Sequence, residues 1–288
     1  MLKKPDKNKV KIVADSSCDN LTVSDIDFES VPLTISTNER IFRDNKDIDV
    51  ENMLKYFSSY HGRSYTSCPG IDDWLRCYGG ADVLYVVVLS SGISGAYSTA
   101  VAAANIYKET HPDAKVRVFD THSAGPQVRL LVDKIAECVR NGMKFEEVCK
   151  LADDYLKRIR IFFSLESFHN FAQNGRVNKT IARFAGVLGI HIMATASLDG
   201  KIEILKKCRG SKATLRGFID CMKNAGYTSG KCYIAHCKNL DFANEISSEI
   251  CKIYPSAKIS IYKTRGLCSY YAEKGGILLS CECKKIYE

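Results

Sequence analysis

Three apolar, β-branched stretches stand out in the first half of the chain, and each ends in small polar residues. They read VKIVAD at residues 10–15, DVLYVVVLSS at residues 82–91 and AKVRVFDT at residues 114–121. Helical patterns follow the last two, at residues 95–110 and 125–142, where Gly142 stops the second helix. Because strands that alternate with helices pair in parallel, we expect a doubly wound α/β sheet whose strands are covered on both faces.

The pattern changes near residue 160. A helix at residues 145–158 and a strand at 159–165 lead into a helix pair at 167–175 and 178–189. A hairpin at 190–209 is predicted with Asp199 and Gly200 at its turn. The remaining pattern predicts helices and strands in the order 212–224, 231–237, 242–254, 258–265 and 275–285. We therefore expect two domains, the parallel-sheet domain at residues 1–160 and an α+β domain at residues 161–288.

Composition and charge exclude several classes of protein. The 288 residues contain no apolar run long enough for a membrane-spanning helix, and the start, MLKKPDKNKV, lacks the apolar segment of a signal peptide. The net charge is +8, but the basic residues are spread along the chain and no zinc finger or RNA-binding motif occurs. We therefore expect no nucleic-acid partner and at most transient contact with a membrane surface.

The thirteen cysteines include no C-x-x-C pair. Cys232, Cys237, Cys281 and Cys283 lie in strand-like segments, which favours buried thiols over zinc ligands or disulfides. We expect no metal site, and free thiols in such number indicate a reducing, cytoplasmic location.

The segment LSSGISG, residues 89–95, joins an apolar strand to a helix start. Backbone N–H groups and the positive end of the dipole at a helix N-terminus form a binding site for an anion. Ser91 and Ser94 would add hydroxyl donors, and Gly92 would let the anion approach the backbone closely. The same spacing is one residue short of the G-x-S-x-G elbow of serine hydrolases. Ser94 as a nucleophile needs a histidine base held by a carboxylate, and none of the six histidines shows that context. A capped helix with a tight turn also accounts for the pattern.

Two further loops carry candidate polar groups. Thr66 and Ser67 precede Pro69 in YTSCPG, which places two hydroxyl groups on a stiffened loop. Arg176, in NGRVNKT, follows a glycine stop and could bind a carboxylate or a phosphate. Taken alone, each loop is equally compatible with a surface turn.

In this order, the segments resemble the DegV family over nearly the whole chain. LSSGISGAYSTA is similar to the family's L-S-S-x-L-S-G-T-Y-x-x-A signature, and TSCPG is similar to its T-S-Q-P-S loop. VADSSCDN, VPLTI with FRD, VFDTHSAG and NGRVNKT resemble further family segments. The chain departs from the family pattern in Cys68-Pro69-Gly70, in His191-Ile192 and in Tyr271, which stands where members often carry a histidine.

The resemblance implies a two-domain protein that holds a fatty acid of the palmitate, stearate or oleate class between its domains, without catalysis of its own and without a cofactor. By position, the carboxylate would be bound by Thr66, Ser67, Ser91, Gly92 and Ser94, with Arg176 at the pocket and docking position. The acyl chain would lie in an apolar tunnel of the second domain. Members of the FakB type present the acid to a separate fatty acid kinase, whose acyl phosphate product feeds phospholipid synthesis. Two alternatives remain, a serine esterase or acyl hydrolase that uses Ser94, and an interaction protein that has lost lipid binding.

Overall fold

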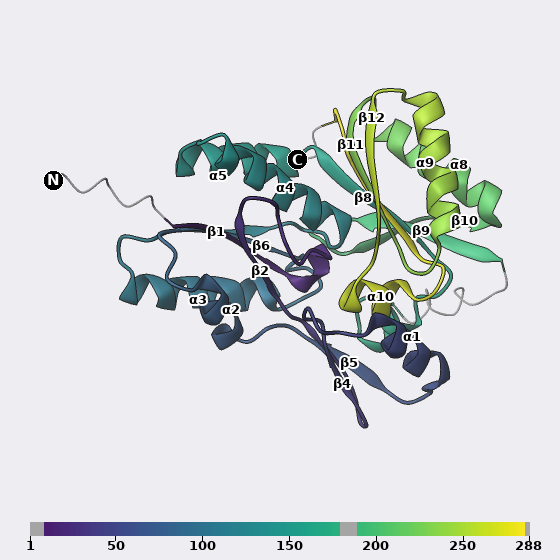
Figure 1. Cartoon of the computed structure of the whole chain (residues 1–288). Coiled ribbons are helices and arrows are strands. Elements are labelled where there is room, and N and C mark those ends of the chain that lie inside the picture. Colours follow the sequence, from purple (N-terminus) through teal and green to yellow (C-terminus); the bar gives the residue numbers. More distant parts are fainter. Residues whose placement is uncertain (1–8, 179–188, 286–288) are drawn as a thin grey trace.

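The computed structural model describes residues 9–178 and 189–285, which form three sheets and the helices around them (Figure 1). The first sheet contains four strands in the order β2-β1-β6-β7, and every neighbouring pair is parallel. Its strands are β1 (Val10–Asp15), β2 (Asp27–Val31), β6 (Val83–Val88) and β7 (Lys115–Asp120). A 3-10 turn, η1 (Ser16–Cys18), follows β1. The predicted parallel sheet is therefore confirmed.

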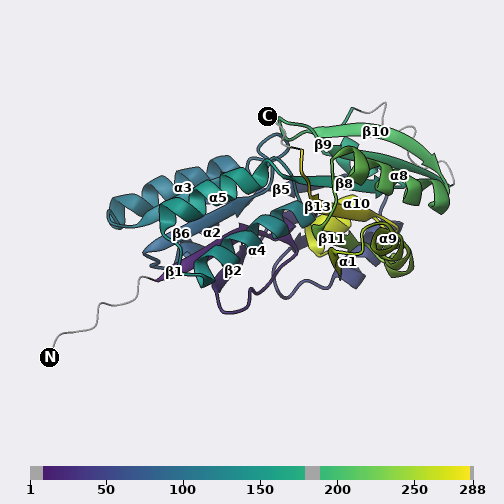
Figure 2. The ribbon, with the colours of Figure 1, turned by 90° about the horizontal axis from the view of Figure 1, so that it is seen from above.

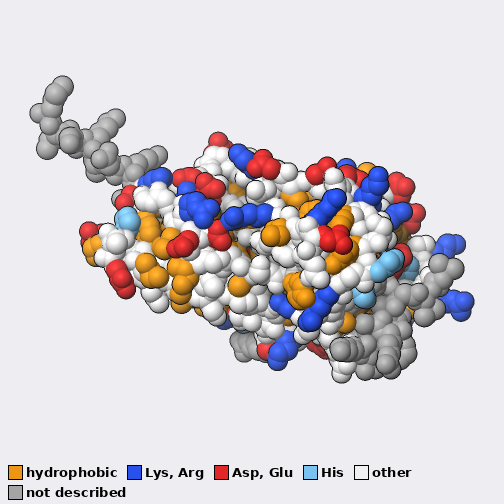
Figure 3. Space-filling view, turned by 90° about the horizontal axis from the view of Figure 1, so that it is seen from below, with side chains coloured by type: hydrophobic (Ala, Val, Ile, Leu, Met, Phe, Trp, Pro, Cys, Tyr) orange, Lys and Arg blue, Asp and Glu red, His pale blue; other side chains and the backbone are white. Residues whose placement is uncertain are grey.

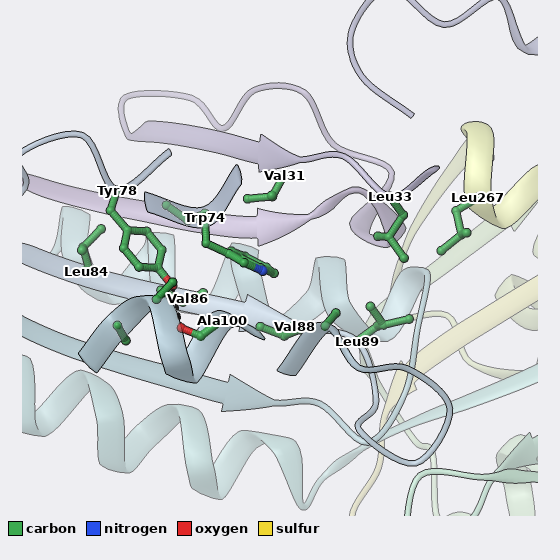
Figure 4. Close-up of a cluster of buried hydrophobic side chains, with 14 of the residues drawn as sticks. Val31, Leu33, Trp74, Tyr78, Leu84, Val86, Val88, Leu89, Ala100 and Leu267 are labelled. Carbon is green, nitrogen blue, oxygen red and sulfur yellow. Dashed lines mark hydrogen bonds between the residues drawn. The ribbon is translucent and has the colours of Figure 1, made fainter. Parts of the chain in front are cut away.

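Helices cover both faces of this sheet (Figure 1). They are α2 (Ile71–Tyr78) and α3 (Ala96–Thr110) on one face and α4 (Pro126–Arg140) and α5 (Phe145–Leu156) on the other. All six residues of β6 are buried, which explains its uninterrupted apolar sequence. Trp74 and Tyr78 of α2 fill the space between the sheet and α3, where the Tyr78 hydroxyl donates to the Ala100 carbonyl at 3.0 Å (Figure 4).

A small antiparallel sheet and a helix extend the first half beyond the predicted elements. The sheet has the order β4-β3-β5 and is formed by β3 (Thr34–Thr37), β4 (Ile41–Arg43) and β5 (Ser64–Ser67). Helix α1 (Val50–Ser59) lies between β4 and β5 in the sequence. Thr66 and Ser67 thus lie at the end of a strand, in register with Ile35 and Thr34.

The third sheet is mixed and contains six strands in the order β10-β9-β8-β13-β11-β12. They are β8 (Ile159–Leu165), β9 (Ile190–Ala196), β10 (Ile202–Arg209), β11 (Gly230–His236), β12 (Ala257–Lys263) and β13 (Ile277–Glu282). Helices α8 (Ser211–Asn224) and α9 (Leu240–Ile253) pack on one face. The opposite face carries Ile161, Phe163, Ala194 and Leu278 toward the first half of the molecule. Because side chains alternate along each strand, one face of the sheet packs against helices and the other faces the first half of the molecule.

The predicted hairpin at residues 190–209 is confirmed, because β9 and β10 pair in antiparallel and Gly200 N–H donates to the Ser197 carbonyl at 2.9 Å in the turn. Of the predicted helix pair, the first is the short α6 (His169–Gln173). The second, predicted at residues 178–189, lies almost entirely outside the described residues.

Helix α10 (Gly266–Ala272), between β12 and β13, lies at the junction of the two halves (Figure 1 and Figure 2). Leu267 and Tyr270 belong to the same buried cluster as Trp74. The Asp44 carboxylate accepts hydrogen bonds from the Gly266 and Leu267 N–H groups, both at 2.9 Å. A segment from the end of the chain therefore completes the core of the first sheet.

All thirteen cysteines are free, and the four in strand-like segments are buried, as predicted. In the part of the chain that the structure describes, no helix is long and apolar enough to cross a membrane, and no cluster of His, Cys, Asp or Glu side chains is arranged to hold a metal ion. The face shown in Figure 3 carries basic and acidic side chains next to one another.

Candidate functional site

A cavity of about 260 Å³ lies between the first half of the molecule and the face of the six-stranded sheet opposite α8 and α9. It is reached by the carboxyl ends of β6 and β7, where ligands of doubly wound sheets bind. Most of the side chains around it are apolar. They include Leu33, Leu89, Ile93, Ala124, Ile161, Phe163, Leu165, Phe171, Ala196, Ile202, Leu267, Ala272 and Leu278.

The turn at residues 89–95 forms one polar edge of the cavity, and buried Asp15 fixes its start. The Asp15 carboxylate accepts hydrogen bonds from Leu89 N–H at 2.6 Å and from Ser17 N–H at 2.9 Å. Burial raises the pKa of Asp15 to about 6, although both hydrogen bonds act in the opposite direction. Asp15 thereby ties the end of β1 to the end of β6, the two strands at which the sheet reverses its order.

Ser94 lines the cavity at the start of α3. Its oxygen accepts a hydrogen bond from Ala96 N–H at 3.2 Å, so its own proton is available to donate into the cavity. Among the described residues that line the cavity, none is a histidine that could serve as a base for Ser94. The geometry suits a donor to an anion at the N-terminus of α3.

Ser91 and Gly92, from the same turn, are not among the lining residues. Ser91 N–H donates to the Asp120 carboxylate at 3.2 Å. A Cβ atom on Gly92 would lie 2.3 Å from the Asp199 carbonyl oxygen, so the absence of a side chain lets the β9–β10 hairpin approach. Next to it, the Ser90 hydroxyl donates to the Gly200 carbonyl at 2.7 Å.

Thr66 and Ser67 both line the cavity, beside the Ser-Gly turn. The two segments are adjacent, since a Cβ atom on Gly95 would lie 3.4 Å from Cys68 Sγ. Thr66 N–H donates to Asn174 Oδ1 at 3.0 Å, which ties the strand end to the loop after α6.

Tyr271 is the lining residue that the sequence marked only as a departure from the family pattern. Its hydroxyl lies 2.7 Å from Thr66 Oγ1, and its ring stacks on Phe171 with centroids 4.4 Å apart. Burial raises the pKa of Tyr271, while Thr66 and Arg176 act in the opposite direction. One proton of the Thr66–Tyr271 pair is used in their mutual hydrogen bond, so the pair, which the neutral phenol of α10 completes, has one proton left to donate into the cavity.

Arg176 supplies the positive charge of the polar edge. It is half-buried and lines the cavity, where Nε donates to the Ile93 carbonyl at 3.1 Å and Nη1 donates to the Asn174 carbonyl. Among the described residues, these partners are backbone carbonyls, which do not neutralise the guanidinium. The structure thus brings together Thr66, Ser67, Ser94 and Arg176 around one cavity, with Tyr271 added.

The DegV family model matches residues 9–281. The chain belongs to the DegV family. A curated DegV domain-containing protein of Streptococcus pneumoniae, spr0652, is 38% identical over 276 residues, which cover 94% of this chain and 98% of that protein. The predicted family and its fold are therefore confirmed.

Two solved DegV structures resemble this chain along nearly its full length. A DegV family protein of Eubacterium eligens, loaded with heptadecanoic acid, is 45% identical with a TM-score of 0.94, covering 96% of this chain and 100% of its own. The Fatty Acid Kinase (Fak) B3 protein of Streptococcus pneumoniae, loaded with linoleic acid, is 36% identical with a TM-score of 0.94 over the same shares. Fatty acid binding is thus a property of close DegV relatives.

Proposed function

We propose that this DegV protein binds a long-chain fatty acid in the cavity between its two halves, with the carboxylate at the polar edge and the acyl chain along the six-stranded sheet. The observation that carries the proposal is the division of one cavity into hydroxyl donors and a guanidinium at one edge and a predominantly apolar lining elsewhere, where Thr195 and Lys201 are polar exceptions with hydroxyl or charged side chains outside that edge. Solved relatives of 45% and 36% identity that hold heptadecanoic and linoleic acid support it.

The carboxylate would accept hydrogen bonds from Ser94 and from the Thr66–Tyr271 hydroxyl pair, with Ser67 at the exposed margin and Arg176 as the counter-ion. Hydrogen bonds to a charged group are worth roughly 1.5–3 kcal/mol each, and each buried methylene contributes about 0.8 kcal/mol. The acyl chain thus supplies most of the affinity, and the polar edge selects an acid over other lipids.

The direct test is mass spectrometry of lipids extracted from the purified protein, followed by titration of the delipidated protein with palmitic acid. We expect a co-purified fatty acid and saturable binding of one equivalent. Absence of both would refute the proposal.

We further propose that the protein performs no catalysis and presents the acid to a separate fatty acid kinase in the cytoplasm. The relative described as a Fak B protein supports the kinase partner, and thirteen free cysteines suit a reducing compartment. Loaded protein, a bacterial fatty acid kinase and ATP should yield acyl phosphate, which hydroxylamine traps as a hydroxamate. The control omits the DegV protein. An equal yield of hydroxamate without it would contradict its proposed role in presenting the acid to the kinase.

The esterase alternative depends on an activated Ser94. A fluorophosphonate probe would label Ser94 if a base activated it, and we expect no labelling. The third alternative, an interaction protein without lipid, predicts that the delipidated protein binds no fatty acid.

A further inference from the structure

Asn174, the residue that ends α6, contacts several residues of the polar edge but is not among the described residues that line the cavity. Its side-chain oxygen accepts from Thr66 N–H at 3.0 Å. Nδ2 donates to the Asn170 carbonyl at 2.9 Å and to the Tyr270 hydroxyl at 3.0 Å. A side-chain amide has two protons, and these contacts use both. The orientation of the Asn174 amide is therefore fixed.

Asn174 is one of two consecutive amides that hold the open side of β5. This strand lies at one end of its three-stranded sheet, with β3 on one side and the residues of α6 on the other. On the open side, Gln173 Oε1 accepts from Ser64 N–H at 3.1 Å. Asn174 accepts in the same way from Thr66, two residues further along the strand. The amides thus pair alternate backbone donors that a neighbouring strand would otherwise pair.

Tyr270 is held by a chain of hydrogen bonds whose direction follows from the number of protons. Ser64 Oγ donates its one proton to Gln173 Oε1 at 2.6 Å. In the 2.6 Å contact between the Tyr270 and Ser64 hydroxyl groups, Tyr270 must therefore be the donor. The Tyr270 oxygen in turn accepts from Asn174 Nδ2. The chain runs from Asn174 through Tyr270 and Ser64 to Gln173, and it holds α10 against β5.

Three members of the proposed carboxylate site depend on these contacts for their positions. Thr66 is held through its N–H, and its hydroxyl lies 2.7 Å from that of Tyr271, which follows Tyr270 in α10. The Arg176 guanidinium donates through Nη1 to the Asn174 carbonyl. Binding groups keep a productive geometry only when the residues behind them are held by packing and hydrogen bonds. Asn174 supplies such support to groups from β5, from α10 and from its own loop.

We propose that Asn174 is a positioning residue of the fatty acid site, which holds the Thr66 and Tyr271 hydroxyl groups and the Arg176 guanidinium in the arrangement that binds a carboxylate. This inference rests on the proposed function and adds a residue that acts through others. Because Asn174 supports the polar edge, its loss should weaken the binding of an acid more than that of an uncharged lipid of equal length.

The test is titration of the delipidated protein with palmitic acid and with hexadecanol, for the wild type, Asn174→Ala and a matched control, Gln173→Ala. Gln173 supplies the same kind of group to the same strand, but to Ser64 instead of Thr66. We expect Asn174→Ala to bind palmitic acid about tenfold more weakly, and hexadecanol within about twofold of the wild type. Gln173→Ala should bind both ligands within about twofold of the wild type.

A double variant separates positioning from a general loss of stability. If Asn174 acts partly through the Thr66 hydroxyl, Asn174→Ala should cost only about threefold in a Thr66→Ala background, because residues that act together are not additive. Asn174→Asp is a second variant of the same shape, in case the alanine variant does not fold. At pH 8 its carboxylate can accept from Thr66 N–H but has no proton for Tyr270, so it should lose at least as much palmitic acid affinity. Thermal unfolding verifies that each variant is folded.

Wild-type affinity for palmitic acid in both Asn174 variants would overturn the inference. Equal losses for palmitic acid and hexadecanol would also overturn it, as would a loss in Gln173→Ala as large as that in Asn174→Ala. The same holds if the losses in the double variant with Thr66→Ala multiply fully. If the wild type itself binds no palmitic acid, the proposed function fails, so the two failures are distinguishable.

Discussion

At the polar edge of the cavity, Thr66, Ser94 and Tyr271 bring hydroxyl groups from three segments that are far apart in the sequence, whereas Ile161, Phe163 and Leu278 reach the apolar wall from two paired strands. The polar groups are held by individual hydrogen bonds, such as the one between Thr66 and Tyr271. The apolar wall depends only on strand alternation. We therefore expect the polar edge to respond to the loss of single atoms and the apolar wall to respond to changes in volume.

The largest effect should come from blocking the apolar wall. Ala196→Trp places an indole where the cavity is lined by β9. If the indole displaces four methylenes of the acyl chain from the cavity, binding would lose about 3 kcal/mol, or roughly two-hundredfold in palmitic acid affinity. Calorimetric titration with palmitic acid measures this loss. Ala213→Trp, on α8 at the helix-covered face, should bind normally, and full affinity in Ala196→Trp would place the chain elsewhere.

A smaller loss is expected at the polar edge. The double variant Thr66→Ala with Ser94→Ala removes two proposed donors and should weaken palmitic acid binding by roughly 150-fold, equivalent to about 3 kcal/mol. Binding of hexadecanol, which has no carboxylate, should change much less. Ser98→Ala, an exposed serine of α3, serves as the control. Parallel losses for both ligands would show that the edge does not select for charge.

Tyr271→Phe tests the hydroxyl of α10 alone. The ring can still stack on Phe171, but Thr66 loses its partner. We expect palmitic acid affinity to fall by about fivefold, as for one hydrogen bond of about 1 kcal/mol. Tyr271→His restores a polar group at this position and should recover part of the loss. No change in the phenylalanine variant would remove Tyr271 from the proposed site.

The smallest effect on fatty acid affinity is expected from substitution of the buried Asp19. This substitution should instead change the stability of the fold. Burial raises the pKa of Asp19 to about 8, although Arg265 N–H donates to its carboxylate at 2.7 Å. The folded protein therefore keeps a proton that the unfolded chain releases above about pH 4, so this group lowers the free energy of unfolding as pH rises from 4 to 8.

Asp19→Asn should consequently flatten the decline in melting temperature between pH 5 and pH 8, because an amide does not titrate. The exposed Asp25→Asn is the matched control and should keep the wild-type decline. An identical pH profile in Asp19→Asn would show that Asp19 is ionised in both states.

Much of the fold was predictable because long elements carry periodic patterns. The buried β6 and the β9–β10 hairpin follow directly from apolar runs and an Asp-Gly turn. The short β3, β4 and β5 were not predicted, since three- or four-residue strands give too few alternations. Helix α2 did carry usable signals, with Gly70 before it, Gly79 in the left-handed conformation after it, and Asp73 accepting from Gly70 N–H.

The site was predictable where local sequence has a recognisable chemistry. Thr66, Ser67, Ser94 and Arg176 were predicted, and the structure places them around one cavity. Tyr271 was not, because its position at the cavity results from packing against Thr66, which lies 205 residues away in the sequence.

The place of α10 has a consequence for the order of events during synthesis. Leu267 and Tyr270 complete the core around Trp74, and Asp44 is buried against the N–H groups of Gly266 and Leu267. The ribosome must therefore release the chain as far as Ala272 before the first sheet can close its core, whereas domains usually fold as units from the N-terminus. Until then the nascent parallel sheet exposes apolar surface, and chaperones are expected to engage it at this stage.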